Sequence, residues 1–350
     1  MRVKLLDLTR GILMLYIVFI VHGLFWLRLL PQSISSLFLF EMPAMFIISG
    51  YAYFQYEDSR ARKLIPFGAR EYFFFIVSRF TRILTPYLVY ALACIALLYF
   101  WPGLGKFGEY NFWSLFIAWI NPFNFGKGFT SNLLDLHLWF IPVFLFVSAL
   151  LPFAAKLRPF KNPNFLLLLL GIAILAYAST KIQFTGSDFA KKILFYLLFA
   201  LFGYYLARSA DYFSRARFGL IALASLLLMV GLVALNDWNL KVMDMQVNKF
   251  PPNHIFFIFS CFWISLFLFL GYRSTGILKK MESCIDQFWL SPFVKAGYSI
   301  YLWQGIGYTL AVEAGKALDI NKIVVWFAAV LLSVILGGLA APMERIRLRV

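Results

Sequence analysis

The sequence predicts an all-α membrane protein, a polytopic bundle of about ten transmembrane helices with both termini in the cytoplasm. Three observations support this prediction: the composition, the length of the apolar runs and the distribution of positive charge. Of the 350 residues, 62% are hydrophobic and only 14% are charged, whereas soluble domains are about half apolar and about a quarter charged. The apolar residues form long runs and do not alternate with polar ones, which excludes an outer-membrane barrel.

Ten apolar runs approach the length of about 20 residues that a helix needs to cross a bilayer. The expected spans are 11–30, 34–54, 83–100, 138–155, 164–180, 191–207, 218–235, 254–272, 296–313 and 323–342. The runs at 191–207 and 296–313 are the weakest. A further stretch, Tyr110 to Ile120, is too short to span and is expected at the interface. The first run lacks a small-residue cleavage site and is read as a retained span, so residues 1–350 are predicted to form one integral-membrane domain.

Positive charges test the span count independently, because Lys and Arg collect in cytoplasmic loops. With ten spans and a cytoplasmic N-terminus, 22 of the 32 Lys and Arg residues fall on the cytoplasmic side. The net charge of +16 therefore reports orientation, and no nucleic-acid binding is inferred. The three cysteines are an odd number without metal-ligand spacing, so neither a disulfide nor a metal site is expected.

Ionisable residues inside spans are functional candidates, because each costs about 2.5–3.5 kcal/mol on insertion scales. His22 lies deep in the first predicted span, about 12 Å from its outer end, and Glu41 lies about 10.5 Å into the second. A short connection joins these spans, so we expect His22 to contact Glu41. The carboxylate would fix the imidazole tautomer and leave the other nitrogen as a general base. The alternative is a structural polar pair between two helices.

Arginines mark the predicted cytoplasmic ends of the first and third spans. Arg10 lies on the helix that carries His22, and Arg79 and Arg82 precede the third span. A guanidinium suits phosphate groups because of its fixed fork of donors. Anchoring to anionic lipid explains Arg79 and Arg82 nearly as well.

Other polar and aromatic residues can be explained by structural roles, such as helix packing or contact with the membrane interface. Ser49 and Gly50 indicate that two helices approach closely here. Ser49 is not expected to act as a nucleophile, because the sequence beside it contains no base to activate it. Tyr301 and Gln304 lie inside the ninth span, where packing is the simpler role, and His137 lies at the outer start of the fourth. Tryptophans from Trp101 to Trp139 suit an interfacial belt or, alternatively, a platform for a sugar.

These residues together resemble the integral-membrane acyltransferase-3 family, whose members move acyl groups, usually acetyl from acetyl-CoA, onto sugars and other cell-envelope acceptors. The resemblance rests on short motifs in a fixed order: Leu6–Gly11 followed by His22, Met42–Tyr51, Arg79–Arg82 with Pro86 and Tyr87, His137–Ile141, Phe250–Pro252, and Ser299–Trp303.

The resemblance implies a membrane O-acyltransferase of the bacterial cytoplasmic membrane. His22, with Glu41, would act on the acyl group or the acceptor hydroxyl, and Arg10, Arg79 and Arg82 would bind the phosphates of acetyl-CoA. His137, Trp139, Tyr301 and Gln304 are assigned to the acceptor, an envelope polysaccharide or lipid-linked saccharide. Membrane lipids and envelope-synthesis proteins are the expected partners, and no metal is expected.

The chain departs from the family pattern at three places. It has one residue more than usual between Arg10 and His22, which turns one of them by about 100° unless the helix bulges. Glu41 and Gln304 stand where many relatives carry histidine. These departures leave two alternatives open, a non-catalytic member of an envelope-synthesis complex and a transporter of a glycan or small metabolite.

Overall fold

The computed structural model describes residues 4–64, 67–104, 111–123, 133–156, 187–272, 276, 283 and 287–346. These residues form helices and connections, and no strand occurs among them apart from an isolated bridge between Lys249 and Pro252. Seven helical stretches are long and apolar enough to cross a membrane: Leu5–Trp26, Gln32–Ala61, Ala69–Phe100, Ser187–Arg208, Arg215–Ala234, His254–Gly271 and Lys322–Glu344. The chain is thus an all-helical, multi-pass membrane protein. The count of ten spans and the cytoplasmic termini stay predictions.

Each expected span corresponds to a helix, except 164–180, which lies outside the described residues. The fourth span is the shorter helix α7 (Phe140–Ala154), and the short stretch near Tyr110 contains helix α6 (Phe112–Ile120). The third differs most from expectation, because helix α5 begins at Ala69 and ends at Phe100. Hydropathy detects only the apolar part of a helix, so the sequence pattern predicts a loop for the charged first turns of α5. Arg79 and Arg82 therefore lie on α5 itself.

The described chain divides into two compact units that alternate along the sequence. The first contains residues 1–9, 30–66 and 146–284, and the second contains 10–29, 67–145 and 285–350. The units are described separately below, and the prediction of a single domain over 1–350 stays a prediction.

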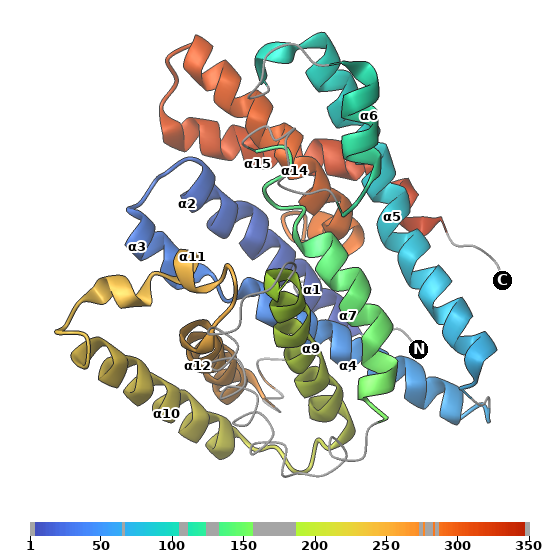
Figure 1. Ribbon diagram of the computed structural model, residues 1–350, viewed down its shortest axis with the longest axis vertical. Coiled ribbons are helices and arrows are strands. Elements are labelled where there is room, and N and C mark those ends of the chain that lie inside the picture. Colours follow the sequence, from blue (N-terminus) through green and yellow to red (C-terminus); the bar gives the residue numbers. More distant parts are fainter. Residues whose placement is uncertain are drawn as a thin grey trace. The chain divides into compact units, whose positions relative to one another are not determined.

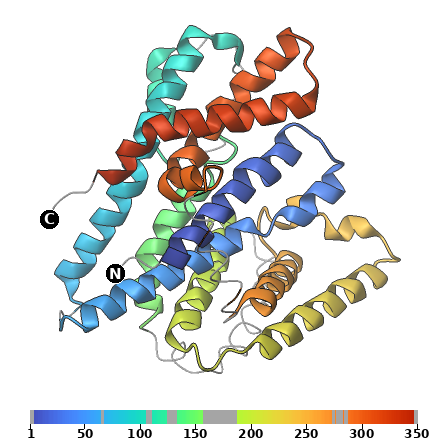
Figure 2. The ribbon, with the colours of Figure 1, turned by 180° about the vertical axis from the view of Figure 1, so that it is seen from behind.

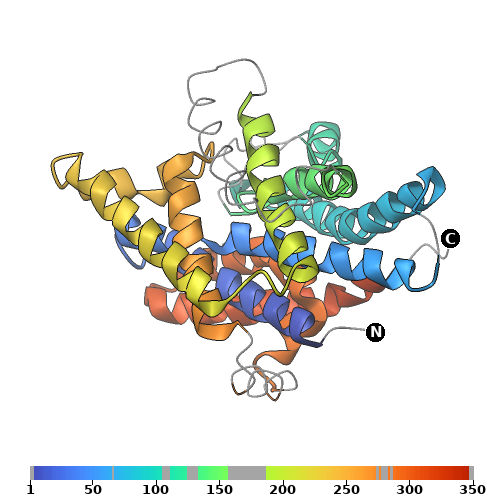
Figure 3. The same cartoon turned by 90° about the horizontal axis from the view of Figure 1, so that it is seen from below.

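Two helix pairs organise the first unit. Helix α4 (Glu41–Ala61) packs against α9 (Ser187–Arg208), and α10 (Arg215–Ala234) packs against α12 (His254–Gly271) (Figures 1 and 3). A Cβ on Gly50 would overlap the carbonyl oxygen of Ala200, and a Cβ on Gly203 would overlap that of Ile47. The two backbones therefore touch at reciprocal glycines, which confirms the close approach expected at Gly50.

A buried ion pair ties α4 to the chain before α12. Glu41 is the first residue of α4, and its Oε1 lies 2.5 Å from Nζ of Lys249, which follows the short helix α11 (Met245–Asn248). Only 3% and 5% of the two side chains are exposed. Each charge is therefore held almost without water, and each depends on the other for compensation.

The second unit is built on the antiparallel pair α14 (Ser291–Ala317) and α15 (Lys322–Ala340) (Figure 2). Helix α5 packs against α6 and also contacts α14. Helix α14 is kinked at Ala296 and is buried along most of its length, including Gln304, which has no exposed surface. A helix covered by neighbours need not be strongly apolar, which explains why its run at 296–313 was among the weakest in the sequence.

The first span of the second unit contains a π-helix. Helix α1 (Lys4–Leu15) continues into the π-helix Tyr16–Val21 and then into α2 (His22–Trp26). The N–H of His22 donates to the carbonyl of Ile17, five residues back. Such a turn takes up one residue more than an α-helical turn. The extra residue noted between Arg10 and His22 is absorbed here, which brings the two back toward one face of the helix.

Side chains from α14 and α15 hold this π-helix. The hydroxyl of Tyr308 donates to the carbonyl of Val18 at 2.7 Å, and Nε1 of Trp326 donates to that of Phe19 at 2.8 Å. The Trp326 ring also stacks on Phe19, with ring centres 4.5 Å apart. Carbonyls without a partner are costly in a membrane, so these two donors stabilise the widened turn.

The buried ion pair predicts a specific pattern of stability. Glu41→Gln and Lys249→Met should each destabilise the protein by about 3–5 kcal/mol, because each leaves one buried charge uncompensated. The double variant should lose less than the sum, since it buries no lone charge. Thermal unfolding of the detergent-solubilised variants measures this coupling, and strictly additive losses would contradict it.

The π-helix predicts that shortening and lengthening this segment differ in effect. Deletion of Ile20 should convert the π-helix into an α-helix, keep the faces of Arg10 and His22, and cost little more than the two side-chain hydrogen bonds. Insertion of one alanine after Ile20 should rotate His22 by about 100° and destabilise strongly. Membrane content and melting temperature of both variants test this, and equal damage by deletion and insertion would refute the account.

Candidate active site

Polar and aromatic side chains converge in the second unit around His22. Its ring stacks on Trp26, with centres 4.2 Å apart and planes at 6°. The ring of His137, from the turn before α7, lies 6.3 Å from His22 and 5.7 Å from Trp26. Tyr301 of α14 lies 6.2 Å from His22 and 5.2 Å from His137. The structure thus brings together three residues that lie far apart in the sequence.

Gln304 orients His22. Nδ1 of His22 lies 2.7 Å from Oε1 of Gln304, and Nε2 of Gln304 donates to the carbonyl of Tyr301 at 2.7 Å. Because the amide nitrogen is used on that carbonyl, the amide oxygen faces His22 and accepts its Nδ1–H. The proton of the neutral ring is therefore on Nδ1, and Nε2 carries the lone pair. This tautomer makes Nε2 the nitrogen that can accept a proton.

His137 is held in the opposite tautomer. Its Nε2 lies 3.0 Å from the carbonyl of Leu302, so that nitrogen donates and Nδ1 carries the lone pair. The residue is 1% exposed, and burial lowers the pKa of His137 to about 3, with a further contribution from nearby His22. His137 is therefore neutral at physiological pH.

Tyrosine hydroxyls anchor the turn that carries His137. Tyr90 of α5 donates to the carbonyl of Leu134 at 2.6 Å, and Tyr301 donates to the carbonyl of His137. A Cβ on Gly305 would overlap the Tyr90 hydroxyl and lie 2.8 Å from Cε1 of His137. Trp139 follows in the same turn and is half-buried.

The arginines predicted at the cytoplasmic side also lie near one another. Arg79 and Arg82 are three residues apart on α5, which places them on one face. The charges of Arg82 and Arg10 both act on Arg79. Nε of Arg79 is buried without a hydrogen-bond partner among the described residues, and its guanidinium lies 5.7 Å from the ring of Phe75. The three form a compact patch of positive charge.

Glu41 belongs to the other unit, where its partner is Lys249. The predicted contact with His22 would join the two units and stays a prediction. In the second unit Gln304 performs the orienting role that sequence reasoning gave to Glu41. Sequence reasoning missed Gln304 in this role, and also Lys249, Tyr308 and Trp326, because their partners lie more than 200 residues away.

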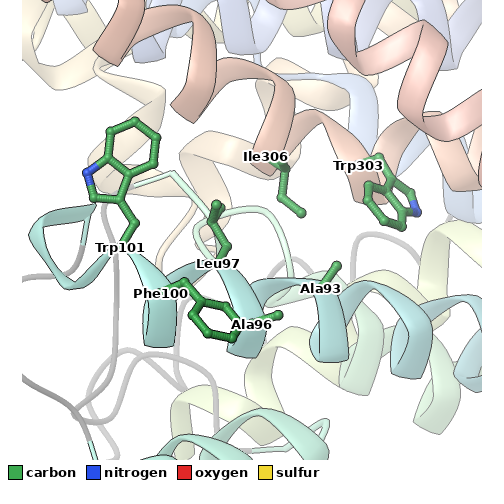
Figure 4. Close-up of a pocket in the computed structure, with 7 residues that line it drawn as sticks. All are labelled: Ala93, Ala96, Leu97, Phe100, Trp101, Trp303 and Ile306. Atoms are coloured by element: carbon green, nitrogen blue, oxygen red, sulfur yellow. The ribbon is translucent and has the colours of Figure 1, made fainter.

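A cavity of 560 Å³ lies beside this site in the second unit (Figure 4). Its lining is apolar and comes from α5 and α14: Ala93, Ala96, Leu97, Phe100, Trp101, Trp303 and Ile306. None of these lining residues, all from the described part of the chain, is titratable. The Trp303 ring lies 5.9 Å from that of Tyr90, which is 5.9 Å from His137, so the cavity is separated from the histidines by at least one ring.

An oriented histidine and an arginine patch thus lie in one unit of a helical membrane protein. Residues 3–341 match the acyltransferase-3 family, described as an acyltransferase domain. The chain belongs to this family and is a membrane acyltransferase. No curated protein and no solved structure matches it.

The Gln304 hydrogen bond predicts how substitutions at this position affect catalysis. Gln304→Met should lower kcat by about 100-fold, because general-base catalysis depends on the lone pair at Nε2 of His22. Gln304→Glu keeps an acceptor for Nδ1–H but loses the donor to the carbonyl of Tyr301, so it should retain more activity than Gln304→Met and less than the wild type. The KM for the acyl donor should change little in both, as measured by acyl-CoA turnover in detergent. Equal losses in both variants would show that the amide serves only packing.

Proposed function

We propose that this acyltransferase moves an acyl group, acetyl in the simplest case, from acyl-CoA at the cytoplasmic face to a hydroxyl of an envelope polysaccharide or lipid-linked saccharide. The observation that carries the proposal is the His22–Gln304 hydrogen bond, which leaves Nε2 of His22 as a proton acceptor in a family of acyltransferases. The enzyme would work in the cytoplasmic membrane of a bacterium, next to envelope-synthesis proteins.

In the proposed reaction, Nε2 of His22 takes the proton of the acceptor hydroxyl as its oxygen attacks the thioester carbonyl. The carbon–sulfur bond then breaks, CoA leaves as the thiolate, and the imidazolium returns the proton to sulfur. An ester and free CoA-SH result, and His22 is again neutral. Nδ1 keeps its proton throughout because Gln304 accepts it. Holding both reactants in this geometry would supply much of the acceleration.

The arginine patch supports a phosphate-rich donor. Arg10, Arg79 and Arg82 concentrate positive charge in the same unit as His22, and guanidinium groups bind phosphate oxygens through paired donors. We assign the patch to the phosphates of acyl-CoA. Anionic lipid is the competing ligand, and the salt dependence of the KM for acyl-CoA in lipid-free detergent separates the two.

The acceptor assignment rests on the aromatic and polar groups around His22. His137, Tyr301 and Gln304 surround the proposed base, and Trp139 follows His137 in the turn before α7. Aromatic rings with a few hydrogen-bonding groups suit a saccharide, whose faces are apolar and whose edges carry hydroxyls. Glu41 contributes to the proposal through the fold of its own unit.

The decisive experiment measures alkali-labile acyl esters on envelope glycans. Cells carry the wild-type protein, His22→Ala, His254→Ala or a deletion of the protein. His254 is the first residue of α12 in the first unit, so His254→Ala is a matched control for loss of an imidazole outside the site. We expect the esters to disappear in the deletion and in His22→Ala and to persist in His254→Ala.

Membrane content of each variant is measured in parallel, to separate lost catalysis from lost protein. Mass analysis of the released acid identifies the acyl group. Esters that persist in the deletion strain would refute glycan acylation, and normal acylation by His22→Ala would refute the assignment of the base.

A further inference from the structure

A carboxylate from the end of the chain binds the backbone of α14 at its kink. In a regular α-helix the N–H of Ser299 would donate to the carbonyl of Lys295, four residues back. Between these two residues lies Ala296, whose φ of −137° and ψ of 27° are not helical. The N–H of Ser299 donates to Oε1 of Glu344, in the short 3-10 helix Ala341–Arg345 that follows α15. A side chain that enters the helical hydrogen-bond ladder accounts for a kink.

Charge and packing both suit Glu344 to this position. The N–H groups in the first turn of a helical segment carry partial positive charge, which favours an anion. The 3-10 helix that carries Glu344 contacts α5, α14 and α15. Just before it, a Cβ on Gly337 of α15 would lie only 2.4 Å from Cα of Ile300, so the backbones of α15 and α14 touch beside Ser299. Tight packing therefore brings the carboxylate to the kink.

The segment of α14 directly after Ser299 carries the groups that hold the site. Leu302 accepts from His137 through its carbonyl, and Gln304 accepts from His22 through its amide oxygen. Gln304 is five residues beyond Ser299, about 7.5 Å along the axis, so a tilt of about 10° at the kink displaces it by about 1.3 Å. The bond from His22 is 2.7 Å long, and hydrogen bonds of this kind extend only to about 3.2 Å. A small tilt is therefore enough to break it.

We infer that Glu344 is a positioning residue of the acyltransferase: its carboxylate fixes the part of α14 after the kink and thereby keeps Gln304 against Nδ1 of His22. The inference rests on the proposed function, in which His22 is the base. Glu344 acts through the backbone N–H of Ser299, whose hydroxyl has no hydrogen-bond partner among the described residues. Without the carboxylate, α14 tilts, Gln304 moves away, and the proton of His22 is no longer held on Nδ1.

Substitutions of two glutamates test this role in turnover of acetyl-CoA by the full-length protein in detergent. Glu344→Ala removes the acceptor for the N–H of Ser299, and Glu344→Gln keeps an amide oxygen there. Glu313→Ala is the matched control, because Glu313 lies on α14 itself and pairs with Lys316 three residues away. We expect Glu344→Ala to lower kcat by about 100-fold, as displacements of about 1 Å do, with little change in KM. Glu344→Gln should recover much of kcat, and Glu313→Ala should match the wild type.

The proton of His22 is followed directly by nitrogen NMR of protein that is isotope-labelled at histidine, without any acyl donor. The chain has only three histidines, so His22→Ala and His254→Ala assign the signals. The nitrogen shifts distinguish a protonated ring nitrogen from one that carries a lone pair. We expect Nδ1 of His22 to be protonated in the wild type and in Glu313→Ala, and both tautomers to be present in Glu344→Ala. A merely structural glutamate would lower the melting temperature and leave the tautomer unchanged.

The inference is overturned if Glu344→Ala keeps the wild-type signal of His22, or if Glu344→Gln and Glu344→Ala lose kcat equally. If Glu344→Ala does not reach the membrane, Glu344→Asp replaces it, because its shorter side chain withdraws the carboxylate from Ser299, and the same outcomes apply. The NMR result does not depend on the substrate. A change of tautomer in a protein that does not acylate glycans would support the inference and refute the proposed function, whereas acylation with an unchanged tautomer in Glu344→Ala would refute the inference alone.

Discussion

The hydrogen bond between His22 and Gln304 is the interaction on which the candidate site depends. A neutral imidazole has one proton, and the nitrogen that does not carry it is the base. Gln304 determines the position of this proton. Its amide nitrogen donates to the carbonyl of Tyr301, so its oxygen faces His22 and accepts the proton on Nδ1. A glutamine thus orients the histidine without adding a charge to a membrane-embedded site, where a carboxylate would be costly. The departure from histidine at this position is therefore compatible with catalysis.

The same helix that carries Gln304 organises the rest of the second unit. Helix α14 supplies the carbonyl that holds His137, the hydroxyl of Tyr301 that anchors its turn, and the hydroxyl of Tyr308 that bonds to the π-helix. The π-helix in turn determines the face on which His22 emerges relative to Arg10. Burial explains how one helix accommodates so many polar groups, because Ser299, Gln304 and Thr309 contact protein and not lipid.

The two units treat buried ionisable groups differently. In the first unit, Glu41 and Lys249 are paired at 2.5 Å, so opposite charges compensate each other and secure the chain before α12 against α4. In the second unit, one ring nitrogen of His22 and one of His137 each donate to a neutral oxygen. Ion pairing favours a fixed structure, whereas neutral histidines favour proton transfer. The arginine patch gathers three positive charges in the second unit, where it suits a polyanionic donor.

Composition and the lengths of the apolar runs were sufficient to predict a helical membrane protein and most of its long helices, because contact with lipid selects apolar residues, which the local sequence reports directly. The resemblance of short, ordered motifs indicated the family, and His22 and the arginines were candidates because charged or ionisable groups are rare in apolar segments. Only the tertiary structure decided four other features: the starting residue of α5, the partner of Glu41, the orienting role of Gln304 and the π-helix. The residues in the His22 and Glu41 pairs are 282 and 208 positions apart, and hydropathy contains no information on how distant helices rotate against each other. Which imidazole nitrogen holds the proton follows from that rotation alone.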